Sequence, residues 1–165
     1  FHCVGDEPVA ELGSWVYDPR DGTEVAAFLI LPASYYAHLA RDKRTYVMQA
    51  ELIAAIAVFF TLPERCRGRA VLHFIDNTGA LSALVHGYAS KGDRARMVNA
   101  FHIALFGLRS HIHFVWVPSA ANISDWCTRP DMFHKIPPST RFVEMVIPSS
   151  EQLDGDLASS LPSPV

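Results

Sequence analysis

Four isolated acidic residues stand where a strand is expected to end or where a helix faces inward: Asp6, Glu51, Asp76 and Asp125. Asp76 directly follows the apolar run 70–75, which predicts a buried strand. Carboxylate oxygens are the ligands that Mg²⁺ prefers. Two such ions about 3.5–4 Å apart can acidify a water and stabilise the leaving oxygen in phosphodiester hydrolysis. The residue types therefore predict metal chemistry, provided that the fold brings the four acids together.

Each acid also has a local interpretation. Asp76 would cap the helix that follows it, and Asp6 would be an ordinary turn residue. Asp125 would complete a capping box with Asn122, three residues earlier. Glu51 is harder to explain locally, because it is the only charged residue from position 46 to 62 and a lone buried acid is costly without a partner or a metal. Four acids held together without cations would raise one another's pKa.

The elements that must position these acids follow one order along the chain. Turn residues at 18–22 separate two expected strands, and a run at 46–61 rich in Ala, Leu and Ile predicts a helix that is apolar nearly all round. Strands are expected at 1–4, 13–17, 24–31, 70–75 and 111–117, and helices at 46–61, 78–88, from about 93 to 110, and from Asn122 onward. This order, βββαβααβα, predicts an α/β fold in which a three-strand antiparallel meander precedes parallel strands.

Length and composition fit one globular domain. The chain has 165 residues, of which 50% are hydrophobic and 19% charged. The apolar run 52–60 is too short to span a bilayer, so we expect no membrane association. From Ile136 the composition shifts to Pro, Ser and acidic residues, which predicts a domain over 1–135 and a tail or linker over 136–165. Because the chain begins with Phe1 rather than Met, we expect a fragment of a larger protein.

Cysteine content and net charge indicate the cellular compartment and the way in which nucleic acid could be bound. The three cysteines, Cys3, Cys66 and Cys127, are an odd number at wide spacings, which favours a reducing, intracellular compartment, either cytoplasmic or nuclear. The net charge of −3 argues against a protein that holds nucleic acid by electrostatics alone. It is compatible with a protein whose negative charge is gathered where metal ions neutralise it.

Three short motifs resemble the ribonuclease H domains of retroelement reverse transcriptases. They are Gln49-Ala50-Glu51-Leu52, then Phe74-Ile75-Asp76-Asn77-Thr78-Gly79-Ala80-Leu81, and then Val117-Pro118-Ser119-Ala120-Ala121-Asn122-Ile123-Ser124-Asp125. They occur in the family's order on the expected elements, and with the opening strands they cover most of residues 1–131. The sequence looks most like the retrotransposon branch that uses tyrosine recombinases. The resemblance implies a ribonuclease H-like fold, a mixed five-stranded sheet flanked by helices.

The same resemblance implies an activity. It predicts a metal-dependent endonuclease that hydrolyses the RNA strand of RNA/DNA hybrids, as a domain of a reverse transcriptase polyprotein. Asp6, Glu51, Asp76 and Asp125 would then hold two Mg²⁺ ions, for which Mn²⁺ can substitute. The implied partners are the hybrid and the reverse transcriptase domain of the same polyprotein.

Substrate contacts are expected outside the acids. Lys91, Arg94 and Arg96 form the densest basic cluster and would meet phosphates of the DNA strand, with a solvated helix face as the alternative. Asn77 and Ser119 lie beside the predicted acids and would contact the 2′-hydroxyl that distinguishes RNA from DNA.

The sequence departs from the family pattern in two places. The loop 118–121 lacks the histidine that the cellular enzymes carry there, which predicts slower turnover. Asp6 is not followed by the family's usual small residues, so Glu11 is a substitute for the first acid. These departures leave open a ribonuclease H-like module that binds nucleic acid or protein without catalysis. An integrase or transposase core is a third alternative, disfavoured because its last acid is a glutamate on a longer helix.

Overall fold

The structure is a computed structural model that describes residues 2–4, 7–31, 35, 47–90, 92–149 and 153. Two residues with predicted roles, Asp6 and Lys91, lie outside the described residues.

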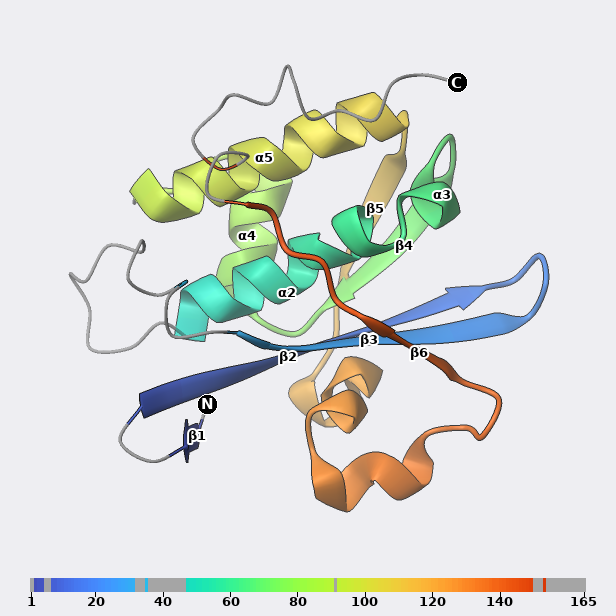
Figure 1. Ribbon diagram of the computed structural model, residues 1–165. Coiled ribbons are helices and arrows are strands. Elements are labelled where there is room, and N and C mark those ends of the chain that lie inside the picture. Colours follow the sequence, from blue (N-terminus) through green and yellow to red (C-terminus); the bar gives the residue numbers. More distant parts are fainter. Residues whose placement is uncertain are drawn as a thin grey trace.

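The larger sheet has four strands in the order β1-β2-β3-β6 (Figure 1). The first three run antiparallel, which confirms the predicted meander, and β6 lies parallel to β3. Their bounds are β1 (His2–Val4), β2 (Glu7–Asp18), β3 (Thr23–Leu31) and β6 (Arg141–Glu144).

Strand β2 is longer than expected. It begins at Glu7 rather than near Gly13, because the alternation of buried positions 10, 12 and 14 extends the inward-facing side of the strand toward the N-terminus. The turn after it was predicted correctly. Gly22 has a φ of 68° and donates its backbone N–H to the Asp18 carbonyl at 2.9 Å, which closes the hairpin with β3.

A second sheet holds only two strands, β4 (Ala70–Ile75) and β5 (His111–Trp116), which are parallel and in register from Ala70 opposite His111 to Ile75 opposite Trp116. The α/β class and the parallel arrangement of the later strands are therefore confirmed. The expectation of one five-stranded sheet is wrong, because β2 and β4 share no hydrogen-bonded ladder and the strands divide into two sheets.

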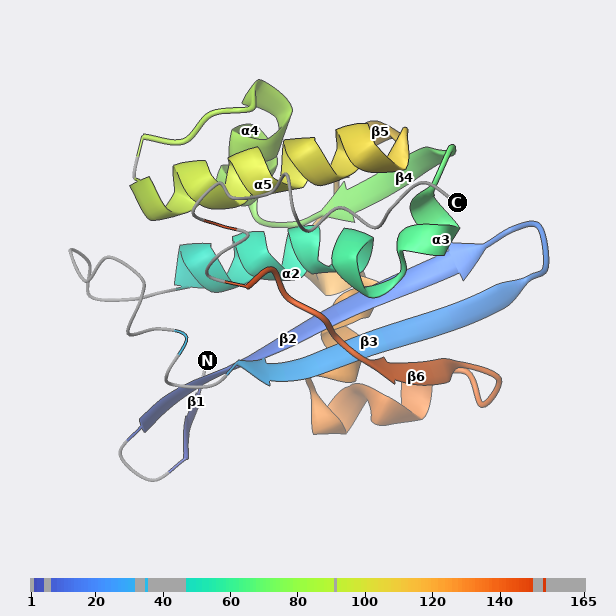
Figure 2. The ribbon, with the colours of Figure 1, turned by 45° about the horizontal axis from the view of Figure 1, so that its top comes forward.

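Helix α2 (Val47–Thr61) is the centre of the core. It packs on β2 on one side and on the long helix α5 (Gly92–Leu108) on the other, and Figure 2 shows it between these layers. Leu52, Ile53 and Ile56 are fully buried, as expected for a helix that is apolar nearly all round. The remaining helices are α3 (Pro63–Cys66) and α4 (Thr78–His86). Within the described ranges, no helix is long and apolar enough to cross a membrane.

Three short 3₁₀ helices follow β5: η1 (Ser119–Ala121), η2 (Ile123–Cys127) and η3 (Pro130–Lys135). The orange segment in Figure 1 lies on the face of the β2–β3 pair opposite to α2. Asn122 caps η2 as predicted, although the helix is a single 3₁₀ segment of five residues.

The segment after Ile136, expected as a tail or linker, contributes strand β6 to the larger sheet. Thr140 and Met145 on either side of this strand are buried, and the Thr140 hydroxyl donates to the Glu24 carboxylate at 3.2 Å. Most of the chain after 149 lies outside the described residues.

Candidate metal-binding site

Three of the predicted acids come from three different elements. Glu51 is on the second turn of α2, Asp76 follows β4, and Asp125 is in the middle of η2. All three side chains are partly exposed. The parallel strands β4 and β5 end side by side. Asp76 and the segment that leads to η2 therefore both begin at the carboxyl ends of these strands.

The charges of these acids interact. Burial raises the pKa of Glu51 to about 7, and repulsion from Asp76 and Asp125 contributes to the rise. The pKa of Asp125 is also raised, first by burial and then by Asp76. Asp76 therefore lies near enough to both Glu51 and Asp125 for its charge to act on them.

Asp76 does not cap the helix that follows it. Asn77 has this role: its Oδ1 accepts the backbone N–H of Ala80 at 3.0 Å, at the first turn of α4. The backbone carbonyl of Asp76 accepts the indole N–H of Trp116 at 3.1 Å. Asn77 thus has the capping role that was the local alternative for Asp76. The Asp76 carboxylate does not serve as this cap.

Asp125 is held by the Asn122 side chain and not by the backbone contact of the expected capping box, because the Asn122 backbone N–H donates to the Ser119 carbonyl. The Asn122 amide donates to Asp125 Oδ1 at 3.1 Å, while its carbonyl oxygen accepts from the Ser124 backbone at 3.3 Å. Helix η2 lies so close to β2 that a Cβ added to Gly13 would be 2.6 Å from the Ser124 carbonyl oxygen. The position of Asp125 therefore depends on a glycine in the middle of a strand.

Arg129 is a site residue that the sequence analysis missed. Its guanidinium contacts Asp125 Oδ2 at 2.6 Å, and its positive charge opposes the rise in the pKa of Asp125. The spacing of four residues between an acid and an arginine was the available signal.

The predicted substrate residues that the structure describes belong to the start of α4, to η1 and to α5. Asn77 uses its side-chain oxygen in the helix cap, and Ser119 is exposed in η1. On α5, Arg96 is exposed and Arg94 is partly buried. The start of α5 is tied to the helix of Glu51, because the Gln49 amide donates to Asp93 Oδ2 at 2.9 Å.

The donor set suits a hard divalent cation such as Mg²⁺. Carboxylate oxygens that repel one another, with one pKa raised to about 7, are stabilised when a cation binds between them. Within the part of the chain that the structure describes, no three His, Cys, Asp or Glu side chains are close enough to hold a metal ion as they stand. The fit is therefore one of chemistry and charge.

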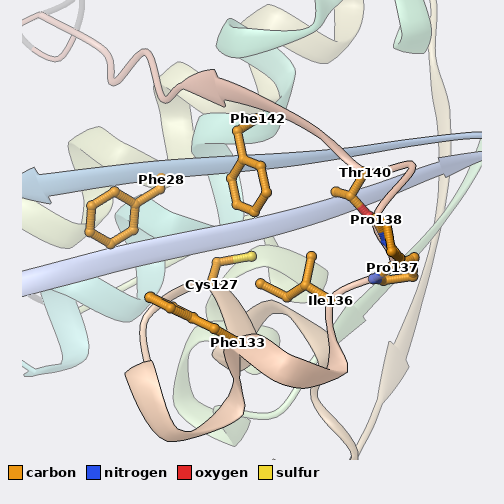
Figure 3. Close-up of a pocket in the computed structure, with 8 residues that line it drawn as sticks. All are labelled: Phe28, Cys127, Phe133, Ile136, Pro137, Pro138, Thr140 and Phe142. Carbon is orange, nitrogen blue, oxygen red and sulfur yellow. The ribbon is translucent and has the colours of Figure 1, made fainter.

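A pocket of about 440 Å³ lies between the strands β3 and β6 and the segment that contains η2 and η3 (Figure 3). Phe28 and Phe142 line it from the strands, and Phe133 and Ile136 from η3 and the loop after it. Its lining contains no ionisable residue except the Cys127 thiol, whose pKa burial raises to about 11. It offers apolar contact and has no part in the carboxylate chemistry.

Comparison with known proteins found no match among family models, curated proteins or solved structures. The interpretation of this site therefore depends on its own residues and on the motifs that contain them.

Proposed function

We propose that this chain is a metal-dependent endonuclease that hydrolyses the RNA strand of RNA/DNA hybrids, as a domain of a retroelement reverse transcriptase polyprotein. The proposal is supported by the parallel strands β4 and β5, from whose common end Asp76 and the segment leading to Asp125 depart, and by the action of the Asp76 charge on Glu51 and Asp125. Each acid belongs to one of the three ribonuclease H-like motifs.

Glu51, Asp76 and Asp125 would hold Mg²⁺ or Mn²⁺, with Asp6 as the predicted fourth ligand. Bound cations of this kind acidify a water and stabilise the charge on the leaving oxygen. The protein's own part is to hold acids in place. The Trp116 indole fixes the Asp76 backbone, and Asn122 and Arg129 orient the Asp125 carboxylate.

Recognition of the hybrid would involve groups around the acids. Asn77 uses Oδ1 in the cap, so its side-chain N–H groups can donate to a 2′-hydroxyl, and Ser119 can do the same from its exposed position. Arg94, Arg96 and Lys91 would contact phosphates of the DNA strand. The net charge of −3 predicts weak binding without the rest of the polyprotein.

The test is cleavage of an end-labelled RNA/DNA hybrid in magnesium, and then in manganese, by the chain and two variants. Asp76→Asn should abolish cleavage because it removes a charged ligand. Asp131→Asn changes an exposed acid in η3 by the same chemistry and should cleave like the parent. Cleavage retained by Asp76→Asn would overturn the proposal.

A second candidate is a ribonuclease H-like module that binds nucleic acid or protein without cutting. Two contacts favour it: Asp125 Oδ1 accepts from Asn122 and Oδ2 accepts from Arg129, so a metal ion would compete with both for this carboxylate. This candidate predicts that the hybrid is bound but stays intact in both metals, and that Asp76→Asn leaves the affinity unchanged.

A further inference from the structure

The layer formed by α4 and α5 carries positive charge in a chain that is acidic as a whole. Between positions 77 and 110 the sequence has four Lys or Arg residues against a single acid, Asp93, whereas the whole chain has a net charge of −3. Asp93 lies in the first turn of α5 and accepts a hydrogen bond from the Gln49 amide. Positive charge gathered on one layer of an acidic chain indicates a surface that attracts polyanions such as nucleic acid.

One face of α5 is exposed along most of the helix. Its exposed positions recur every three or four residues and therefore lie on one side: Arg96, Asn99, His102 and Phe106, with Arg109 directly after the helix. At about 1.5 Å per residue, this α5 face is roughly 20 Å long. Figure 2 shows α5 as the outer layer, on the side of α2 away from β2. None of the five side chains is acidic, so a phosphate backbone can lie along this face without meeting a carboxylate on it.

Two aromatic side chains of this layer are exposed to an unusual degree. Phe106 is 86% exposed, and Tyr88, which follows the end of α4, is 69% exposed. Both lie near His102: Phe106 is one turn further along α5, and a Cβ added to Gly87, the residue before Tyr88, would be 3.6 Å from His102 Nε2. The His102 Nε2–H donates to the Leu84 carbonyl at 3.1 Å, which ties α5 to α4 at this point. Exposed rings beside basic side chains are typical of surfaces on which unpaired bases stack.

Arg109 stands where the fold alone would favour glycine. It follows the last residue of α5 with a φ of 53°, the left-handed conformation in which helices commonly end and which glycine adopts without steric cost. Its side chain is exposed, and within the part of the chain that the structure describes its guanidinium has no ion pair. This charge therefore contributes nothing to the fold that glycine would not supply, and it is available to a ligand.

We propose that the α5 face and Tyr88 form a binding surface for single-stranded nucleic acid. Arg96 and Arg109 contact phosphates, and unpaired bases stack on Phe106 and Tyr88. The bases of a duplex are already stacked on one another, so the two rings favour a single strand. A protein partner would require a contiguous apolar core, whereas these rings stand among basic and polar side chains. The surface uses none of the candidate metal ligands, so the proposal is independent of the nuclease activity.

Fluorescence anisotropy of labelled oligothymidine and oligouridine strands of about twelve nucleotides tests this proposal. The whole chain is titrated in EDTA at low salt, where metal-dependent cleavage plays no part. The parent should bind with a dissociation constant of about 10 µM or lower. Phe106→Ala should weaken binding about fivefold or more, because one base loses its stacking partner. Arg109→Gly should reduce the slope of log affinity against log salt by about 0.7, the effect of one lost phosphate contact, without lowering the melting temperature.

Matched controls come from exposed residues on other elements. Phe133→Ala in η3 and Arg141→Ala in β6 remove the same kinds of side chain and should bind like the parent. Duplex DNA of the same length should bind more weakly than the single strand. The proposal is overturned if the parent does not bind the single strand, if duplex binds as tightly, or if Phe106→Ala binds no more weakly than Phe133→Ala. Absence of hybrid cleavage alone would refute the nuclease and leave these results unchanged.

Discussion

The Arg129 guanidinium lies 2.6 Å from the Asp125 carboxylate, and its positive charge lowers the pKa of an acid whose pKa burial and the charge of Asp76 raise. Asp125 thus sits between the repulsion of Asp76 and the attraction of Arg129. The balance decides how readily this carboxylate is charged, and hence how readily it can bind a cation.

Replacing Arg129 should change that balance. In Arg129→Gln the pKa of Asp125 should rise further, because the attraction is lost and the repulsion from Asp76 remains. Arg129→Lys keeps the charge and should show a smaller rise. A carboxyl NMR titration of Asp125 measures both values, and an unchanged pKa in Arg129→Gln would mean that the contact has no electrostatic effect.

Glu51 should make the stability of the protein fall as pH rises. Its pKa is about 7 in the folded chain against an ordinary value of 4.5, so the folded state holds an extra proton between these values. The parent and Glu51→Gln should have similar free energies of unfolding below pH 4.5. Above pH 7 the parent should be less stable by roughly 2 kcal/mol, after allowance for partial exposure of the group.

Urea denaturation at pH 4 and pH 8 measures this difference. Magnesium at pH 8 should narrow it, because a bound cation stabilises the ionised carboxylate. If the free energies of unfolding of the parent and of Glu51→Gln differ by the same amount at pH 4 and at pH 8, the raised pKa of Glu51 and the repulsion between the acids are contradicted.

Gly13 should not tolerate a side chain. A Cβ at this position would be 2.6 Å from the Ser124 carbonyl and 3.0 Å from Thr128 Cγ2, so Gly13→Ala should push η2 away from β2 and cost about 1–3 kcal/mol. Gly92→Ala is the matched control, since its Cβ would meet nothing within 4 Å. Thermal unfolding measures both variants, and equal midpoints for Gly13→Ala and the parent would show that η2 is not held at this contact.

Asp18 should contribute more to the stability of the folded protein than its exposed neighbour Asp21. The Asp18 side chain is 3% exposed and contacts Arg20, Arg65 and Arg69. The hydrogen bond from Arg20 is the main cause of its lowered pKa. A lowered pKa contributes stability at pH values above its ordinary value, and that contribution is lost as pH falls through the folded value.

The comparison of Asp18→Asn with Asp21→Asn tests this role. Asp18→Asn should lower the melting temperature at pH 7 more than Asp21→Asn does, because three arginines lose a shared partner. The difference should shrink in strong acid. Equal effects of the two substitutions would mean that the arginines are solvated and do not hold the strand ends together.

Much of the site was predictable because its signals are local. The strand before Asp76, the apolar helix around Glu51 and the Asn122 cap each depend on residues within one element. Arg129 was also within reach, through its spacing from Asp125. Capping of α4, which was the local alternative for Asp76, is carried out by its neighbour Asn77, and both residues suit that position by type.

The rest depends on partners that are distant along the chain. Strand β6 is four residues long and is stabilised by β3, more than a hundred residues earlier, so its sequence looked like a linker. The division into two sheets follows from which edges meet in space. Alternation of apolar residues predicts that a strand is half-buried and does not predict which strand it pairs with.

Strand-specific cleavage is the most direct test of the central claim. RNA/DNA hybrids labelled on the RNA or on the DNA are incubated with the folded chain in magnesium and in manganese, beside single-stranded RNA and duplex DNA. The account predicts cutting of the RNA in the hybrid alone, and loss of this cutting in Asp76→Asn. An intact hybrid in both metals, or cutting of the DNA strand or of duplex DNA, would contradict it.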